Sequence, residues 1–181
     1  MLGAAVVATR ATGSAPAAAI PGPGPGPVPV PVAASASPPR GTGAIAPEAF
    51  QLLPSLVVVR DGKPLELAGP RTKPTLLHLW ATWCGPCRDE LPAILAFGNG
   101  GDVEVVALSV DDEWPAVERY FGGKIPAVVA WDPKIVVEPA LGVRSLPTTF
   151  LVDTAGRVRG NWVGAQNWAD PALRHLVLAA N

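Results

Sequence analysis

The amino-acid sequence predicts an α/β fold in which helices flank a central mixed β-sheet, and three observations support this fold class. Short, almost wholly apolar runs alternate with segments whose apolar residues recur at helical spacing. Two pairs of strand-like runs are joined by turn residues, which is typical of antiparallel hairpins. All these signals lie in residues 48–181, and a segment of about 130 residues suits a single domain with one hydrophobic core.

The first expected elements are a hairpin, a buried strand and a helix. Residues 56–67 predict the hairpin, because Asp61-Gly62 at its centre supplies the positive φ that a tight turn requires. Residues 75–80 form an almost wholly apolar run, which suits a strand covered on both faces. The next segment has three apolar residues at helical spacing: Leu91, Ile94 and Leu95.

A second strand and helix follow, and then a third strand. Residues 103–110 predict a buried strand, and we expect a carboxylate of Asp111 or Asp112 to cap the helix after it. The third strand is expected at residues 127–130. One face of the intervening helix carries large apolar side chains: Trp114, Val117 and Phe121.

The last third of the chain predicts a short helix, a hairpin and a terminal helix. Residues 134–141 indicate a helix that Pro139 interrupts. Residues 149–162 indicate a hairpin. Asp170 and Pro171 open the final helix, because a carboxylate can cap it and proline is tolerated in its first turn.

The N-terminal part of the chain differs in composition from the rest. Residues 1–19 contain a short apolar stretch followed by small residues, and we interpret them as a signal or anchor remnant. Residues 20–47 are rich in Pro, Gly and Ala, which predicts a disordered spacer because they cannot bury enough apolar surface to offset their ordering entropy. We therefore expect an extracytoplasmic location, in the periplasm or cell envelope. A cytoplasmic location is the alternative if residues 1–19 are not a signal.

Charge and cysteine content exclude several function classes. The net charge of −1 leaves no strongly basic surface, so we expect no nucleic-acid partner. No apolar run reaches the roughly 18 residues that a membrane-spanning helix needs. Two cysteines cannot build a scaffold of several disulfides. We expect a monomer.

The chemistry is indicated by Cys84 and Cys87, which are separated by Gly85 and Pro86 and preceded by Trp83. A helix that begins at this motif would place Cys84 in its first turn, where unpaired amides and the helix dipole stabilise a thiolate. Cys84 is then the attacking sulfur. Cys87, one turn further and more buried, would resolve the mixed disulfide.

A structural zinc site is the alternative interpretation of the cysteine pair. The chain offers four soft ligands, which is the number that tetrahedral zinc requires: Cys84, Cys87, His78 and His175. Their spacing does not match a zinc finger, and a buried strand that leads into the first cysteine is not a zinc knuckle. The pattern therefore favours a redox pair and predicts no metal.

Two motifs together resemble the TlpA-like group of exported thiol-disulfide reductases in the thioredoxin superfamily. They are WATWCGPCRDELP at residues 80–92 and LPTTFLVD at residues 146–153. The resemblance begins near residue 46 and extends to the C-terminus, and it includes a βα insertion at residues 111–130. It implies a thioredoxin fold whose only redox group is the Cys84–Cys87 disulfide, without a cofactor.

The resemblance also implies a cis peptide bond before Pro147 that faces the cysteine pair. The backbone of Leu146 would then pair with an extended substrate beside Cys84. The expected substrate groove has five members: Trp83, Gly85, Pro86, Leu146 and Pro147.

Two ionisable residues near the motif are candidates for proton transfer. Glu90 follows Cys87 by three residues and shares its helical face; burial would raise its pKa and let it exchange a proton with the sulfur. A surface Glu paired with a basic residue is the alternative. His78 lies six residues before Cys84, where relatives carry Asp or Asn. It is either a proton relay or a hydrogen-bonded core histidine.

The sequence thus predicts a thiol-disulfide oxidoreductase that reduces disulfides of exported proteins, with apocytochrome c as a candidate substrate. The resemblance implies that a membrane or soluble thiol donor returns electrons to it. One alternative is a cytoplasmic thioredoxin-like reductase, and another is a non-catalytic adaptor that binds extended peptides near Pro147.

Overall fold

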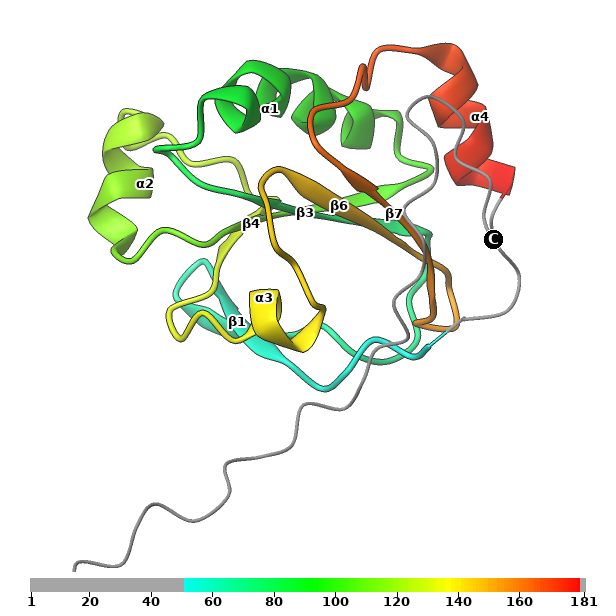
Figure 1. Ribbon diagram of the computed structural model, residues 1–181, viewed down its shortest axis with the longest axis horizontal. Helices are drawn as coiled ribbons and strands as arrows, with labels where there is room; N and C mark the ends of the chain where they lie inside the picture. The colour runs from blue at the N-terminus through cyan, green and yellow to red at the C-terminus, as the bar shows by residue number, and fades with distance from the viewer. Residues whose placement is uncertain (1–50, 180–181) are drawn as a thin grey trace, which may run out of the picture. The chain divides into compact units, whose positions relative to one another are not determined.

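The computed structural model describes residues 51–179, which form a seven-stranded sheet with helices on its faces (Figure 1). The expectations for residues 1–19 and 20–47 lie outside the described residues. The strands are β1 (Val57–Arg60), β2 (Lys63–Glu66), β3 (Thr75–Trp80), β4 (Glu104–Ser109), β5 (Val129–Trp131), β6 (Thr148–Val152) and β7 (Val158–Val163). The helices are α1 (Gly85–Phe97), α2 (Trp114–Tyr120), α3 (Val137–Ala140) and α4 (Pro171–Ala179), with a 3-10 turn, η1 (Gly98–Gly100), after α1.

The strand order is β2-β1-β5-β4-β3-β6-β7, and the sheet is mixed as expected. Strand β4 runs parallel to both β3 and β5, whereas β6 is antiparallel to β3 and to β7. Helices α1 and α4 cover one face of the sheet and α3 lies on the other (Figure 1). The C-terminal end of β3 leads directly into α1, so the cysteine motif lies at one end of the central strand.

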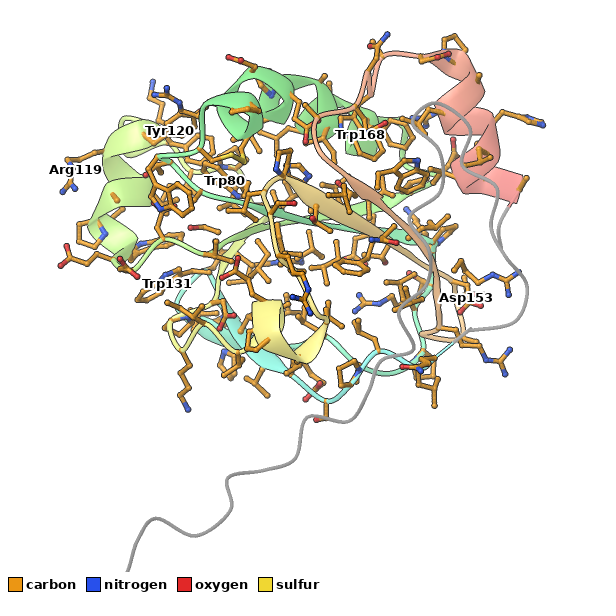
Figure 2. All side chains as sticks on the ribbon, in the orientation of Figure 1. Trp80, Arg119, Tyr120, Trp131, Asp153 and Trp168 are labelled. Atoms are coloured by element: carbon orange, nitrogen blue, oxygen red, sulfur yellow. A yellow bond between two sulfur atoms is a disulfide. The ribbon has the colours of Figure 1, made fainter. Side chains whose placement is uncertain are left out.

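Strand β3 is the centre of the core, and all six of its residues are buried. Strand β4 is also buried from its second residue onward. Both strands are buried because each has neighbouring strands on both sides and helices over it. Trp80, at the end of β3, is fully buried and packs against Tyr120 and Phe121 at the end of α2 (Figure 2). The apolar runs therefore predicted the buried strands correctly.

Both expected hairpins are present. Asp61 and Gly62 have φ values of 50° and 70°, which is the left-handed pair that the β1–β2 turn requires. The final helix also begins as expected, because the Ala172 amide donates a 2.8 Å hydrogen bond to the Asp170 carboxylate. Of the helices in residues 51–179, none is long and apolar enough to cross a membrane.

The structure corrects three details. Strand β5 begins at Val129 rather than at residue 127, and α3 spans only Val137–Ala140 instead of residues 134–141, with Pro139 inside it. Helix α2 has no carboxylate cap: Glu113 occupies the N-cap position and makes no side-chain hydrogen bond there. The Asp111 carboxylate is instead buried and turned toward the loop before α1, where it accepts hydrogen bonds from the amide and the hydroxyl of Thr82.

Candidate active site

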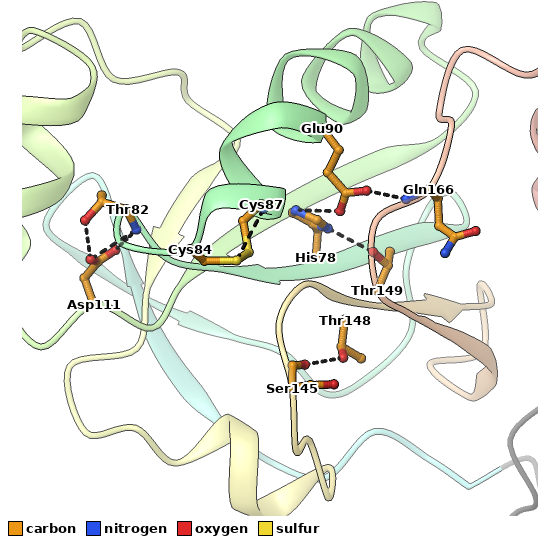
Figure 3. Close-up of a disulfide and its surroundings, with 10 residues drawn as sticks. All are labelled: His78, Thr82, Cys84, Cys87, Glu90, Asp111, Ser145, Thr148, Thr149 and Gln166. Atoms are coloured by element: carbon orange, nitrogen blue, oxygen red, sulfur yellow. Dashed lines mark hydrogen bonds and ion pairs between the residues drawn. A yellow bond between two sulfur atoms is a disulfide. The ribbon is translucent and has the colours of Figure 1, made fainter.

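Cys84 and Cys87 form a disulfide at the N-terminus of α1 (Figure 3). Cys84 is the N-cap residue of the helix, and its sulfur accepts a 3.3 Å hydrogen bond from the Cys87 amide. This amide is one of the donors that a helix leaves unpaired in its first turn. After reduction the same donor and the helix dipole would favour a thiolate at Cys84.

The two sulfurs differ in access to solvent. Cys87 is fully buried, whereas Cys84 is 7% exposed and borders a pocket of about 610 Å³. Trp83, which is 68% exposed, forms the same wall of the pocket as Cys84. The opposite wall comes from the segment between α3 and β6 and includes Val143 and Leu146. A substrate in this pocket can therefore reach Cys84 and not Cys87.

The segment before β6 has the backbone form that the resemblance implies, because the Leu146–Pro147 peptide bond is cis. Leu146 lines the pocket. Pro147, Gly85 and Pro86 do not belong to its lining, although Gly85 and Pro86 are the first residues of α1, next to Cys84. The pairing of β6 with β3 brings this segment, more than 50 residues away in the sequence, to the cysteine end of the sheet.

Glu90 is buried beneath the active site, so the alternative of a surface ion pair is wrong. Its Oε2 atom accepts hydrogen bonds from the Gln166 amide at 2.5 Å and from the Trp168 indole N–H at 3.3 Å. Burial raises the pKa of Glu90 to about 7, against the lowering influence of these two hydrogen bonds. Glu90 can therefore gain or lose a proton near neutral pH.

His78 is fully buried on β3, and its Nδ1 atom lies 2.9 Å from the Thr149 hydroxyl on β6. Its Nε2 atom lies 3.6 Å from Oε1 of Glu90 (Figure 3). Within the part of the chain that the structure describes, neither Nε2 nor Oε1 has another hydrogen-bond partner. Burial lowers the pKa of His78 to about 3, so the imidazole is neutral at physiological pH. His78 is thus hydrogen-bonded in the core and also faces Glu90.

The sequence did not predict the role of Asp111, whose carboxylate holds the loop before Cys84. The Thr82 amide donates to both Asp111 oxygens, at 3.2 and 3.0 Å, and the Thr82 hydroxyl donates to Oδ1 at 2.6 Å. Ser109 donates to Oδ2 at 2.8 Å. An aspartate at the end of a buried strand beside a parallel strand was the available signal, because such strand ends meet at one edge of a sheet.

Thr149, Gln166 and Trp168 were also not expected at the site. They contact His78 and Glu90 only because β6 and the segment after β7 lie beside β3 and α1. His175 is exposed on α4. Among residues 51–179, no three His, Cys, Asp or Glu side chains are placed to hold a metal ion together.

Comparison with known proteins gives one family and many related chains. The redoxin family profile matches residues 43–176. The thiol-disulfide oxidoreductase ResA of Bacillus thuringiensis (strain Al Hakam) is 34% identical over 120 residues, which are 62% of this chain and 68% of the relative. ResA of Bacillus subtilis (strain 168) is 35% identical over 105 residues, covering 54% of this chain and 57% of the relative.

A solved structure also matches most of the chain. The thiol:disulfide interchange protein of the thioredoxin family from Chlorobium tepidum TLS superposes with a TM-score of 0.60 at 27% sequence identity. The match covers 75% of this chain and 99% of that chain. The fold of this chain is therefore shared with a protein of that description.

Proposed function

Because the chain belongs to the redoxin family and is a thiol-disulfide oxidoreductase with a thioredoxin fold, we propose that it reduces disulfide bonds of exported proteins. The expected resemblance to the TlpA-like reductases is confirmed at the level of this family and fold. Apocytochrome c is the candidate substrate. A membrane or soluble thiol donor would return two electrons to the Cys84–Cys87 disulfide after each cycle.

In the proposed reaction the Cys84 thiolate attacks one sulfur of the substrate disulfide. A mixed disulfide forms and the other substrate sulfur leaves as a thiolate. The Cys87 thiol then gives its proton to the Glu90 carboxylate, and its sulfur attacks the Cys84 sulfur. The second substrate sulfur leaves and the Cys84–Cys87 disulfide closes. Two electrons have passed to the substrate, and its two sulfurs take up two protons in total.

The observation that carries this proposal is the difference between the two cysteines. Cys84 borders the pocket and receives an amide hydrogen bond at the helix N-terminus, whereas Cys87 is fully buried behind it. An attacking sulfur must meet a large substrate, and a resolving sulfur must meet only its neighbour. Trp83 and Leu146 are proposed to hold an extended segment of the substrate against Cys84, together with Gly85, Pro86 and Pro147.

A trapping experiment tests the proposal. In Cys87→Ser the mixed disulfide cannot be resolved, so substrate proteins should remain covalently attached to Cys84 and be released by a reductant. Cys84→Ser is the matched control and should trap nothing. Partners that stay bound to both variants under reducing conditions would support the peptide-binding adaptor and contradict the reductase.

The midpoint potential of the Cys84–Cys87 pair tests the direction of electron flow. The Gly85-Pro86 dipeptide between the cysteines is typical of reducing members, so the midpoint potential should lie nearer the roughly −270 mV of thioredoxin than the roughly −120 mV of a strong oxidant. Equilibration with glutathione gives this value. A potential near the oxidising end would replace the proposed reductase with an oxidase.

We also propose an extracytoplasmic location, which the composition of residues 1–19 and 20–47 supports. The domain at residues 48–181 would then act in the periplasm or cell envelope. N-terminal sequencing of the protein from the envelope fraction tests this location. Recovery of the chain with an intact Met1 from the cytosol would favour the cytoplasmic reductase instead.

A further inference from the structure

The buried pair of His78 and Glu90 has a hydrogen-bond arrangement that allows only certain protonation states. Both hydrogen bonds that Glu90 receives end on Oε2, from the Gln166 amide and the Trp168 indole. The backbone amide and the indole nitrogen are hydrogen-bond donors only, so Oε2 must accept from both of them. When Glu90 is protonated, its hydrogen therefore lies on Oε1, the atom that faces His78.

Oε1 of Glu90 and Nε2 of His78 are 3.6 Å apart, and each lacks any other hydrogen-bond partner among residues 51–179. His78 is fully buried and Glu90 is only 6% exposed, so these two atoms have little access to water as a hydrogen-bond partner. A movement of about 0.6 Å closes the pair to an ordinary hydrogen bond of about 3 Å. The two unpaired atoms can therefore act as hydrogen-bond partners for one another.

The other ring nitrogen of His78 faces a hydroxyl group instead of a carboxyl group. Nδ1 lies 2.9 Å from the hydroxyl of Thr149, which can either accept a hydrogen bond or donate one. A neutral imidazole carries its hydrogen on one nitrogen and offers a lone pair on the other. Both tautomers of His78 are consequently satisfied at Thr149, and the choice between them depends on Glu90.

We propose that His78 is a positioning residue that changes tautomer when Glu90 gains or loses its proton. With Glu90 protonated, Oε1–H donates to Nε2 and Nδ1–H donates to Thr149. With Glu90 ionised, Nε2–H donates to Oε1 and Nδ1 accepts from Thr149. The two states differ by one proton, which resides on Glu90, and the imidazole is neutral in both.

This arrangement lets a carboxyl group change its charge in the interior while Oε1 of Glu90 and both ring nitrogens of His78 keep a hydrogen-bond partner in either state. A buried polar group without a partner is a cost to whichever protonation state leaves it unpaired. His78 removes that cost from both protonation states. Resting on the proposed function, the inference gives Glu90 its means of accepting the proton of Cys87 and later releasing it.

The groups that face the pair come from helix α1, strand β6 and the segment after β7. Helix α1 contributes Cys87, which does not titrate in the disulfide form. Strand β6 and the segment after β7 contribute the neutral groups of Thr149, Gln166 and Trp168. No charged neighbour contributes to the pKa shift of either His78 or Glu90.

Nitrogen NMR of the oxidised protein tests the proposal without substrate or reduced cysteine. The chain has two histidines, and a His175→Gln variant identifies the His78 signals. Hydrogen-bearing and lone-pair nitrogens of imidazole resonate at well separated ¹⁵N shifts. From acid to alkaline pH the hydrogen of His78 should move from Nδ1 to Nε2, with the same midpoint as the ¹³C titration of the Glu90 carboxyl.

Three variants sharpen the test. Glu90→Gln should abolish the tautomer change, because the group that drives it no longer titrates. Thr149→Val removes the partner of Nδ1 from both protonation states and leaves the Oε1–Nε2 contact in place, so the tautomer change should persist and keep the same midpoint as the titration of Glu90. Thr149→Ser retains the hydroxyl and should behave as the wild type does.

A single tautomer of His78 throughout the titration of Glu90 would overturn the proposal. So would conversion of His78 to the imidazolium within that range, or a tautomer change that persists in Glu90→Gln. The wild-type titration alone decides the matter if a variant does not fold. Failure of Cys87→Ser to trap substrates would contradict the proposed function and leave the NMR result unaffected.

Discussion

At the scale of single residues, His78 and Glu90 bring two ionisable groups into the interior, and burial acts on them in opposite directions. The pKa of Glu90 rises from 4.5 to about 7, so its contribution to stability is full below about pH 4.5 and is lost as pH rises toward 7. The pKa of His78 falls from 6.5 to about 3, so its contribution is full above about pH 6.5 and is lost as pH falls.

Between about pH 4.5 and 6.5 these two contributions have opposite slopes and largely offset one another. Removing one of the two groups should reveal the effect of the other on the pH dependence of stability. In Glu90→Gln the free energy of unfolding should rise with pH across this range, and in His78→Asn it should fall. Each slope should approach the limit of about 1.4 kcal/mol per pH unit for one proton.

Denaturant unfolding of the oxidised protein at several pH values measures these slopes. The wild-type protein is the reference, and the difference between each variant and the wild type removes the contributions of all other groups. Parallel pH profiles for the two variants would show that the buried pair does not control stability in this range.

Asp111 is a second residue with an effect that the structure defines. Its carboxylate accepts from the amide and hydroxyl of Thr82 and from Ser109, which fixes the loop that ends at Cys84. Asp111→Ala leaves these donors unpaired, so we expect a loss of about 1–3 kcal/mol in the free energy of unfolding and slower reduction of substrates.

Asp112 offers a matched control one position away, because its side chain is exposed. Asp112→Ala should change neither the denaturation midpoint nor the rate of substrate reduction. Equal effects of the two substitutions would mean that general loss of negative charge, rather than the contacts with Thr82, accounts for the result.

At the scale of elements, the start of α1 decides the reactivity of the pair. Cys84 is the N-cap residue, and the Cys87 amide donates to its sulfur. In the reduced protein we expect alkylation of Cys84 by iodoacetamide to follow a thiolate that forms below the roughly pH 8.5 of free cysteine. The pH dependence of the alkylation rate in Cys87→Ser, where Cys84 is the only thiol, measures this.

Cys84→Ser serves as the comparison for that measurement, because it reports on Cys87 alone. Cys87 is fully buried and should react far more slowly with the reagent. A Cys84 that ionises only in the alkaline range of a free thiol would remove the electrostatic basis of the proposed mechanism.

At the scale of the whole molecule, the pocket exists because distant segments meet at the cysteine end of the sheet. Trp83 comes from the β3–α1 loop, and Leu146 and Val143 come from the chain before β6. Trp83 is 68% exposed, so its ring contributes to contact with a partner more than to the core. Trp83→Ala should lower kcat/KM for a protein disulfide about tenfold, which corresponds to about 1.4 kcal/mol.

Val163, on the edge strand β7, is the control for this prediction because it is 59% exposed and outside the pocket lining. Val163→Ala should leave kcat/KM unchanged. Steady-state reduction of a disulfide-bonded protein gives both values, and reduction of a small disulfide should be affected less by Trp83→Ala. Equal losses for protein and small substrates would argue against a role of Trp83 in holding a protein segment.

The sequence predicted those features that depend on local pattern. An almost wholly apolar run identified β3, the Asp61-Gly62 turn identified the first hairpin, and two cysteines at the start of a helical pattern identified the redox pair. Each of these depends on neighbours within a few residues, where hydrophobic period, turn preference and helix spacing act directly.

Tertiary structure alone decided which side chains meet around the pair. Asp111 was expected to cap the helix after it, yet the parallel pairing of β4 with β3 places it beside Thr82. Glu90 and His78 were each singled out, but their facing atoms and their contacts with Thr149 depend on β6 lying against β3. Contacts between residues far apart in the chain follow from how the strands are ordered and paired, and no short-range pattern encodes that order.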